Sequence, residues 1–402
     1  MKIALISAYC LDSTMPLAKH LAEQKTNVHL FGIMPKGNQN VYVVDFSKNK
    51  QPNGFIQTEI ASAQMGKKLC EYLSDLTLKF FIFPGGGKKN FYFKDIYYAW
   101  KLSKHIIKNK FDIVHLIHTS GRFSLLLMFF LKKQNLIQTL HEITDHSGDT
   151  NSSNLKILKQ LIKKNIPIIF HSHISKERFF SFRSTVSKDA FNMNLYTMLR
   201  FSLYETYMQF LPDKGNNTKQ FIEGGGTVVL HFGRIVPYKG IDILIDAIKI
   251  VQKKRPVHLI VAGDGDPYFN FDGIDSYQFF NYSISNEEII HFIMSCTFVV
   301  CPYRSASQSG IPMTVFPFNK PIIASRTGGF KEIIEHNETG ILVSDMDPSS
   351  FADAIETLIT DKVLRRKMAI NIDRKFKQGE FSWPTIAKET INFYKKNSSL
   401  QA

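Results

Sequence analysis

Short apolar runs recur along the whole chain, and amphipathic stretches of helical length separate them. Because polar residues do not occupy every second place in these runs, each run predicts a strand buried on both faces. Such strands alternating with helices predict parallel sheets joined by right-handed crossovers. The runs are "IALISAY", "VHLFGI", "VYVVDF", "DIVHLI", "LIQTL" and "IPIIFHS" in the first half, then "TVVLHFG", "VHLIVAG", "CTFVVCP" and "KPIIAS".

The alternation restarts near residue 226, after the glycine- and asparagine-rich piece "NNTKQFIEGGG". That composition is typical of a linker, and 402 residues are long for a single core. We therefore predict two α/β domains of the Rossmann-like kind, residues 1–205 and 206–375, facing each other across a cleft. Helices are predicted at 240–254 and at 347–359, where Asp347 and Pro348 form a helix-start signal.

The composition is that of a globular protein, with 44% hydrophobic and 21% charged residues. Its four cysteines, Cys10, Cys70, Cys296 and Cys301, have no metal-ligand spacing, which favours reduced thiols and a cytoplasmic protein. The longest apolar run, "FSLLLMFFL" at 123–131, is too short to span a bilayer. The start "MKIALISAYC" is interpreted as a first strand and not as a signal peptide.

The net charge of +15 comes from the first half of the chain. Residues 1–200 contain 28 Lys and Arg against 13 Asp and Glu, whereas residues 201–402 contain 22 of each. A basic half of this kind is expected to face an anionic partner, either nucleic acid or an acidic membrane surface, or else to be a well-solvated face. Nucleic acid is disfavoured because no recognisable binding module accompanies the charge.

The segment 88–110 mixes lysines with tyrosines, phenylalanines and Trp100. On a helix Lys101, Lys104 and Lys108 would share one stripe, and lysines beside aromatic residues suit an anionic bilayer surface. The alternative is that Trp100 and the tyrosines belong to the core.

The stretch "HFGRIVPYKG", residues 231–240, places Arg234 and Lys239 on a glycine-flanked bend after a predicted strand. Because ligands of open α/β sheets bind beyond the carboxyl ends of the strands, we predict a buried anion such as a diphosphate here; a solvated loop is the alternative. Two more loops follow strands in the same half, the turn at Asp264 and Gly265 and the piece "YRSASQSG" at 303–310. A helix that begins near Ser309 would add free N–H groups for an anion.

These loops resemble the donor domain of GT-B glycosyltransferases, specifically the retaining family four, or glycosyl transferases group 1. The likeness is strong over about 226–360 and fainter before it. Three groups of residues carry it: Gly233, Arg234, Lys239 and Gly240; Val261, Gly263 and Gly265; and Pro302, Tyr303, Ala306, Ser307, Gln308, Ser309 and Gly310, followed by Lys320, Pro321, Gly328 and Gly329.

The resemblance implies a retaining hexosyltransferase that uses a nucleotide-diphosphate sugar as donor substrate. Arg234 and Lys239 would hold the diphosphate and stabilise the charge that develops on it, so no metal or other cofactor is required. The resemblance also implies a C-terminal helix, within residues 376–402, that returns to the first domain. The donor-binding set would be Gly233, Gly265, Ser307, Gln308, Ser309, Gly310 and Thr314.

The family usually carries two glutamates around the 303–310 loop. Here the first falls at Ser305 or Ala306 and the second at Thr314, so neither carboxylate is present. This departure leaves two alternatives open, a non-catalytic GT-B subunit and a GT-B nucleotide-sugar epimerase.

In the first half "LIQTLHEITDH" resembles the family's strand that ends in T-x-H-[DE]. It would place His141 near the transferred sugar with Glu142 beside it; a histidine that is merely satisfied at a strand end is the alternative. Asp12 and Ser13 follow the first strand and either contact the acceptor or cap a helix. His171 and His173 have no evident third ligand and are interpreted as structural.

These features together predict a cytoplasmic enzyme, peripheral on the cytoplasmic face of the plasma (inner) membrane. It would extend a lipid-linked or oligosaccharide acceptor in surface polysaccharide biosynthesis.

Overall fold

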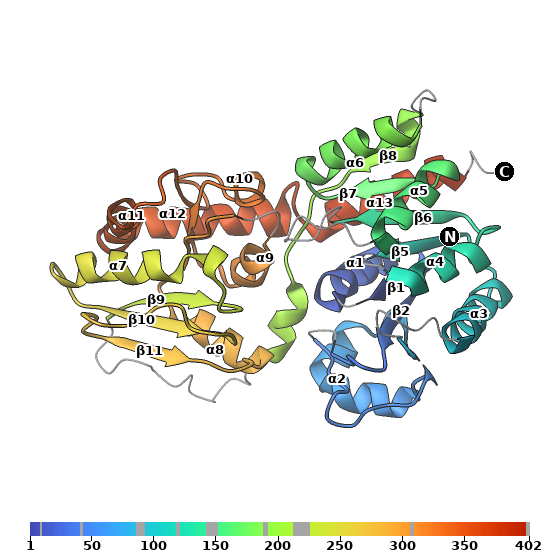
Figure 1. The fold of residues 1–402 in the computed structure, drawn as a ribbon, viewed down its shortest axis with the longest axis horizontal. Coiled ribbons are helices and arrows are strands. Elements are labelled where there is room, and N and C mark those ends of the chain that lie inside the picture. Colours follow the sequence, from blue (N-terminus) through green and yellow to red (C-terminus); the bar gives the residue numbers. More distant parts are fainter. Residues whose placement is uncertain are drawn as a thin grey trace. The chain divides into compact units, whose positions relative to one another are not determined.

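The computed structural model (Figure 1) describes residues 1–8, 10–40, 43–85, 93–117, 121–141, 152–187, 192–211, 226–305 and 309–398. The chain forms two compact units. Unit 1 contains Met1–Gln209 and Glu380–Ala402, and unit 2 contains Phe210–Gly379. The sequence predicts divisions after residues 205 and 375, and most of its predicted linker lies outside the described residues.

Unit 1 is built on an eight-stranded sheet with the order β3-β4-β2-β1-β5-β6-β7-β8. Every pairing is parallel except that of β3 with β4, as expected for strands connected by helices. The strands are β1 (Lys2–Ala8), β2 (Asn27–Pro35), β3 (Gly54–Phe55), β4 (Thr77–Phe83), β5 (Ile113–Ile117), β6 (Leu136–Leu140), β7 (Ile168–Phe170) and β8 (Tyr196–Met198).

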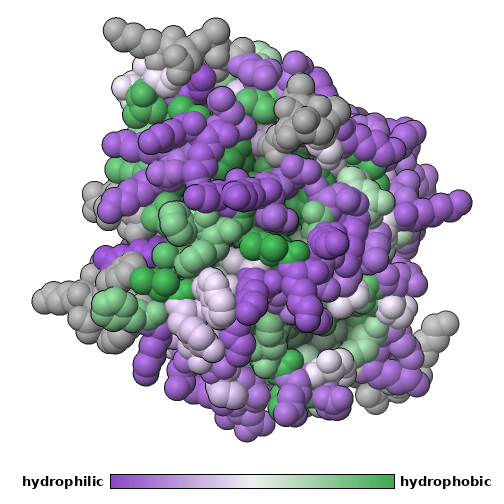
Figure 2. Space-filling view, turned by 90° about the vertical axis from the view of Figure 1, so that its right-hand side faces the viewer, coloured by the Kyte–Doolittle hydropathy of each residue, from purple (hydrophilic) through white to green (hydrophobic). Residues whose placement is uncertain are grey.

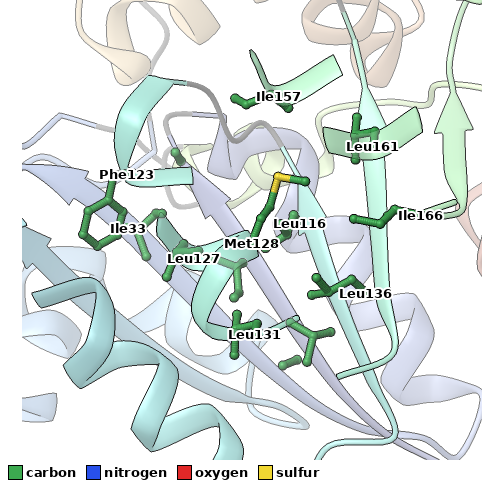
Figure 3. Close-up of a cluster of buried hydrophobic side chains, with 14 of the residues drawn as sticks. Ile33, Leu116, Phe123, Leu127, Met128, Leu131, Leu136, Ile157, Leu161 and Ile166 are labelled. Atoms are coloured by element: carbon green, nitrogen blue, oxygen red, sulfur yellow. The ribbon is translucent and has the colours of Figure 1, made fainter. Parts of the chain in front are cut away.

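The helices of unit 1 cover this sheet. They are α1 (Leu11–Glu23), α2 (Thr58–Tyr72), α3 (Phe93–Lys108), α4 (Gly121–Phe130), α5 (Ser152–Lys163), α6 (His173–Val186) and α13 (Trp383–Ser398), with the 3₁₀ helices η1 (Met193–Leu195) and η2 (Glu205–Phe210). Figure 3 shows how this part of the sheet is covered: Phe123, Leu127 and Met128 of α4, with Leu131 just after it, belong to one buried cluster with strand side chains such as Leu116.

The C-terminal helix α13 is held in unit 1 by two buried polar contacts. The indole Nε1 of Trp383 donates to the carbonyl of Leu203 at 2.7 Å. The hydroxyl of Tyr394, a fully buried side chain, lies 2.6 Å from Nδ1 of His115 on β5. A segment that follows unit 2 in the sequence therefore completes the core of unit 1.

Unit 2 is built on a six-stranded sheet with the order β11-β10-β9-β12-β13-β14, in which every pairing is parallel. Its strands are β9 (Thr227–Phe232), β10 (Val257–Ala262), β11 (Tyr277–Phe280), β12 (Phe298–Cys301), β13 (Ile322–Ser325) and β14 (Gly340–Val343). Its helices are α7 (Ile241–Gln252), α8 (Asn286–Ser295), α9 (Ile311–Val315), α10 (Phe330–Ile333), α11 (Pro348–Thr360) and α12 (Lys362–Asp373), with η3 (Pro237–Lys239), η4 (Phe316–Phe318) and the π turn η5 (Arg374–Gln378).

The predicted fold class of two parallel-sheet α/β units is confirmed, because both sheets have this architecture and β10, β12 and β13 are buried along their whole length. The predicted helices at 240–254 and 347–359 are α7 and α11, and Asp347 caps α11 by accepting from the amide of Ser349.

One predicted strand, "VYVVDF" at 41–46, is wrong over its described part. Residues 43–46 form only an isolated bridge between Asp45 and Asn40. Val43, Val44 and Phe46 are nevertheless buried, and the Phe46 ring packs edge-on against Phe80 at 5.4 Å. The apolar run is therefore buried against the sheet but does not form one of its strands.

Candidate functional site

Each sheet contains a topological switch point, where the order of the strands reverses. In unit 2, β9 lies between β10, which follows it in sequence, and β12, which comes later. Ligands of open α/β sheets bind beyond the carboxyl ends of the strands at such a point. In unit 2 this edge carries the loops after β9, β10 and β12, where the sequence predicts the donor site.

The loop after β9 is fixed by glycines. Gly233 has φ of 112° and Gly240 has φ of 66°, conformations that side chains rarely adopt. A Cβ on Gly240 would also lie 2.0 Å from the carbonyl oxygen of Pro302, at the end of β12. These glycines hold the ends of η3 against the neighbouring loop.

The turn after β10 runs directly beside this loop. The amide of Ile235 donates to the carbonyl of Asp264 at 2.8 Å, and a bridge joins Ile235 to Gly265. A Cβ on Gly263 would lie 2.0 Å from the carbonyl oxygen of Gly233, and one on Gly265 would lie 2.3 Å from that of Ile235. The close approach of two backbones is therefore a sufficient reason for both glycines, whatever else Gly265 contacts.

Lys239 is the unusual side chain of the site. It is only 7% exposed, and its Nζ lies 5.1 Å from the centre of the Tyr303 ring. A Cβ on Gly233 would lie 2.4 Å from Nζ, so the ammonium occupies the space that this glycine leaves. Burial lowers the pKa of Lys239 from 10.5 to about 8; the nearby Cys301 thiol opposes the shift and Arg234 adds to it.

Arg234 is exposed on the same loop. Over the part of unit 2 that the structure describes, neither Arg234 nor Lys239 has a carboxylate within ion-pair distance. A lysine that is buried without a counter-charge is destabilising in a site that stays empty. The pair is therefore well suited to an anionic ligand.

The loop after β12 is tied to the loop after β9 by Arg304, for which the sequence predicts no role. Its guanidinium contacts the Asp242 carboxylate at 3.0 and 2.5 Å, and it also donates to the carbonyl of Pro237 at 2.7 Å. The amide of Arg304 donates to the carbonyl of Tyr238 at 2.7 Å. In the sequence Arg304 is simply an arginine between two motif positions, and no pattern there indicates that it contacts Asp242 and Pro237.

The rest of this loop is described in part. Ser307 and Gln308 lie outside the described residues, and Ser309 and Gly310 are half-buried just before α9. Thr314 is buried, and its hydroxyl donates to the carbonyl of Gly310 at 3.0 Å, within its own helical turn. The helix predicted near Ser309 begins at Ile311 and has only five residues.

In unit 1, Asp12 and Ser13 lie in the first turn of α1, beyond the end of β1, and both are buried. The expected N-cap role is wrong in its position, since Cys10 is the N-cap residue and makes no side-chain cap contact. Asp12 instead accepts from the amide of Ser13 at 2.9 Å, and Ser13 donates to the carbonyl of Cys10 at 3.1 Å. Burial raises the pKa of Asp12 from 3.8 to about 7.

His141 follows β6 at the same edge of the sheet and is half-buried; Glu142 lies outside the described residues. His141 and Ser13 line one small cavity of about 20 Å³, which is room for about one water molecule. The structure thus brings Ser13 and His141 together in unit 1, and Gly233, Arg234, Lys239 and Gly265 together in unit 2. Over the described residues no three His, Cys, Asp or Glu side chains gather into a metal site.

A family model for glycosyl transferases group 1 matches residues 226–361, the stretch that contains all three loops of unit 2. Unit 2 contains a glycosyl transferases group 1 domain. An uncharacterised glycosyltransferase of Methanocaldococcus jannaschii is 27% identical over 314 residues, 75% of this chain and 80% of that protein.

Two further proteins give the likeness more detail. A GDP-mannose-dependent alpha-(1-6)-phosphatidylinositol monomannoside mannosyltransferase of Mycobacterium tuberculosis is 25% identical over 203 residues, 46% of this chain and 52% of that protein. HepE of Anabaena, solved with UDP and glucose, superposes with a TM-score of 0.64 at 17% identity, over 98% of this chain and 99% of HepE. The fold is therefore GT-B, and the glycosyl transferases group 1 domain is one of its two units.

Proposed function

We propose that this protein is a retaining glycosyltransferase of family four, which transfers a hexosyl group from a nucleotide-diphosphate sugar to a glycan acceptor. The observation that carries the proposal is the buried ammonium of Lys239 beside Arg234, at the switch point of the group 1 domain. Among the described residues of unit 2 neither side chain has a carboxylate within ion-pair distance. Two cations without a counter-charge fit a diphosphate better than any neutral ligand.

The chemistry asks for cations at this place. When the bond between the sugar and the diphosphate breaks, negative charge grows on the departing nucleoside diphosphate. Fixed cations stabilise that charge more strongly in the transition state than in the ground state, which lowers the barrier. We propose that the positive charges of Arg234 and Lys239 take the place of a metal ion, so that the transfer is metal-independent.

The other site residues take roles around this pair. In unit 2, Gly233, Gly265, Ser309, Gly310 and Thr314 would bind the donor, with Ser307 and Gln308 from the rest of the same loop. In unit 1, His141 would face the transferred sugar, and Asp12, Ser13 and Glu142 would contact the acceptor. That HepE was solved with UDP and glucose supports a nucleotide-sugar donor for a chain of the same fold.

The donor test is a calorimetric titration of purified protein with UDP-, GDP- and dTDP-linked sugars, followed by product analysis by mass spectrometry. Arg234→Ala combined with Lys239→Ala is expected to abolish donor binding without lowering the melting temperature, because removal of the buried ammonium relieves the cost of its desolvation. Lys253→Ala, which removes an exposed cation at the end of α7, is the matched control and should bind like the wild type.

The same titration separates the two alternatives. A non-catalytic subunit binds no donor of the panel, whereas an epimerase binds a donor and returns the sugar inverted at one carbon with the nucleotide still attached. Release of free nucleoside diphosphate, with the sugar on an acceptor or on water, supports the transferase. A large loss of stability in the double variant would show that Arg234 and Lys239 have a structural role, and it would contradict the proposal.

We also propose that unit 1 docks on an anionic membrane surface, where a lipid-linked acceptor for surface polysaccharide would be met on the cytoplasmic face. The support is α3, whose outward stripe is aromatic: Phe93 is 85%, Tyr97 52% and Trp100 42% exposed. The alternative, that Trp100 and the tyrosines belong to the core, is therefore wrong for Tyr97 and Trp100. Among the described helices none is long and apolar enough to cross a bilayer.

Lysines flank this stripe. Lys101, Lys104 and Lys108 are exposed on α3, and the Nζ of Lys104 lies 4.9 Å from the centre of the Trp100 ring. Figure 2 views the molecule from the side on which α3 and α4 lie in Figure 1, and apolar side chains appear there among hydrophilic ones. A cation over an amphipathic ring suits the headgroup level of an anionic bilayer.

The neighbouring helices extend the same surface. On α4 the Phe129 ring is 58% exposed, with Lys132 Nζ 5.4 Å from its centre. On α5, which packs against α4, Lys156, Lys159 and Lys163 are exposed. The relative from Mycobacterium tuberculosis is named for a phosphatidylinositol acceptor, which supports a lipid-linked acceptor for this chain.

Vesicle binding tests this surface. Lys101→Gln with Lys104→Gln is expected to weaken partition into vesicles of phosphatidylcholine and phosphatidylglycerol about 30-fold, at about 1 kcal/mol per basic residue. Lys67→Gln with Lys68→Gln, two exposed lysines of α2, removes equal charge from the same unit and should change partition little.

Tryptophan fluorescence gives an independent readout, because the chain has two tryptophans and Trp383 is buried. Vesicles should shift the wild-type emission to shorter wavelength, and Trp100→Phe should lose that shift. Partition that is insensitive to salt, or equal losses in both double variants, would remove the membrane proposal.

A further inference from the structure

The corner between β7 and α6 holds two histidines, His171 and His173, that the sequence analysis sets aside as structural. In the structure His171 pairs with a different histidine. Strands β6 and β7 are parallel with Leu140 opposite Phe170, so that His141 and His171 leave the sheet side by side. Their ring centres are 4.8 Å apart, with 43° between the planes.

The ring of His171 is fixed by its own hydrogen bond. Its Nδ1 lies 2.9 Å from the carbonyl oxygen of Leu199, just after β8. Because a carbonyl only accepts, Nδ1 carries the hydrogen and donates it, which sets the tautomer. Burial lowers the pKa of His171 to about 4, against a smaller opposing effect of the bond to Leu199, so the ring is neutral near pH 7.

A third ring completes the cluster. Phe201 meets His141 edge-on, with centres 5.5 Å apart and 79° between the planes, and meets His171 at 5.1 Å and 52°. The backbone of His141 is held by the same corner, since the hydroxyl of Ser175 in α6 donates to its carbonyl oxygen. Both the main chain and the ring of His141 are therefore restrained from the β7–α6 side.

We propose that His171 is a positioning residue that holds the imidazole of His141 in the orientation required for sugar transfer. This inference rests on the role proposed above for His141 at the transferred sugar. An imidazole otherwise has a broad, roughly two-fold choice of χ2 angle, and each choice turns a different nitrogen toward the small cavity that both rings line. The neutral, hydrogen-bonded ring of His171 removes that freedom without placing a positive charge beside His141.

The alternative use of this corner, a metal pair of His171 and His173, finds no support. His173 is exposed at the first residue of α6, whereas His171 uses Nδ1 on a backbone carbonyl. Over the described chain no third ligand gathers with them.

The test combines kinetics with nuclear magnetic resonance on the full chain. His171→Ala removes both the ring contact and the hydrogen bond, His171→Phe keeps the ring only, and His171→Asn keeps a donor near the Nδ1 position only. We expect His171→Ala to lower kcat by about 10- to 100-fold with the donor KM changed less than about twofold, because misplacement affects the reacting geometry and not donor binding in unit 2. The Phe and Asn variants should each recover part of the loss. His173→Asn, on the same corner, is the matched control and should retain wild-type kcat.

Histidine ring nitrogens labelled with ¹⁵N provide the readout that does not need turnover. His171 should show the Nδ1-protonated neutral form throughout pH 5 to 8, and the His141 signals, assigned with His141→Gln, should move in His171→Ala but not in His173→Asn. Unchanged His141 signals, or wild-type kcat in His171→Ala, would overturn the positioning role. If the wild type transfers no sugar, the proposed function fails, while these signals still decide whether His171 orients His141.

Discussion

The protonation of Lys239 gives a quantitative test of the donor site. Its pKa of about 8 compares with 10.5 for an exposed lysine. At about 1.4 kcal/mol for each pKa unit, a charged Lys239 in the empty site costs roughly 3 kcal/mol. A diphosphate that binds next to the ammonium would remove most of this cost and raise the pKa again.

The sign of the pH dependence follows from this shift. Below pH 8 the lysine of the free protein is already protonated, so donor affinity is independent of this group. Above pH 8 the free protein loses the proton and binding must take it up, so affinity falls. If donor binding restores the pKa to the 10.5 of an exposed lysine, donor Kd should be about tenfold weaker at pH 9 than at pH 7, with uptake of about half a proton at pH 8.

The other groups around Lys239 do not titrate in this window. Burial raises the pKa of Cys301 to about 12 and that of Tyr303 well above its ordinary value, and it lowers that of His231 to about 3. The pH dependence between 7 and 9 should therefore report Lys239.

The assay is donor titration by calorimetry in buffers of different ionisation enthalpy, which gives Kd and the protons taken up. Lys239→Arg should bind with a flat pH profile because a guanidinium does not deprotonate, and Lys239→Ala should bind weakly with a flat profile. A flat wild-type profile, or the same tenfold fall in Lys239→Ala, would refute the reasoning.

Three further outcomes follow from other parts of the structure. Gly240→Ala should destabilise unit 2 by more than about 2 kcal/mol, since φ is 66° and a Cβ would meet a carbonyl oxygen at 2.0 Å; Gly273→Ala, with φ of 76° but no atom closer than 3.8 Å, should cost only about 1 kcal/mol in the same thermal melts. Because burial raises the pKa of Asp12 from 3.8 to about 7, its ionisation lowers the free energy of unfolding as the pH rises through this range. In urea denaturation the stability of Asp12→Asn relative to the wild type should therefore increase by roughly 2 to 3 kcal/mol between pH 5 and pH 8. A stability difference that is the same at both pH values would contradict this. Tyr394→Phe should cost about 1 kcal/mol by removing the buried hydrogen bond between the Tyr394 hydroxyl and Nδ1 of His115, and an unchanged melting temperature would exclude that contact as a stabilising one.

The sequence was sufficient for the fold class because the strands of both sheets are apolar almost without interruption. Strand β4, "TLKFFIF", was not predicted, since Lys79 interrupts the run and only three-dimensional packing makes the segment a sheet member. Conversely, the side chains of Val43, Val44 and Phe46 are as buried as those of strand residues, although these three residues do not belong to a strand. A run of apolar residues therefore predicts that a segment is buried. Whether the segment is a strand also depends on the neighbouring strands with which its backbone can form hydrogen bonds.

The donor loops were located from the sequence because glycines and two cations occur there at recognisable spacings. What the sequence could not predict is how those loops are joined. The Arg304 contact with Asp242 links residues far apart in the chain, and the pairing of His171 with His141 depends on which strands are adjacent. Both are properties of strand order, which one sequence does not contain.

The division of unit 1 into two stretches of chain has a consequence for synthesis on the ribosome. Unit 2 is one uninterrupted segment, whereas unit 1 lacks α13 until the segment that follows unit 2 has been synthesised. The nascent protein therefore completes its second unit first and carries an unfinished first unit meanwhile, without the buried hydrogen bonds that Trp383 and Tyr394 make. A stop codon that removed α13 would thus leave unit 2 whole and damage unit 1, although unit 1 is encoded mostly before unit 2.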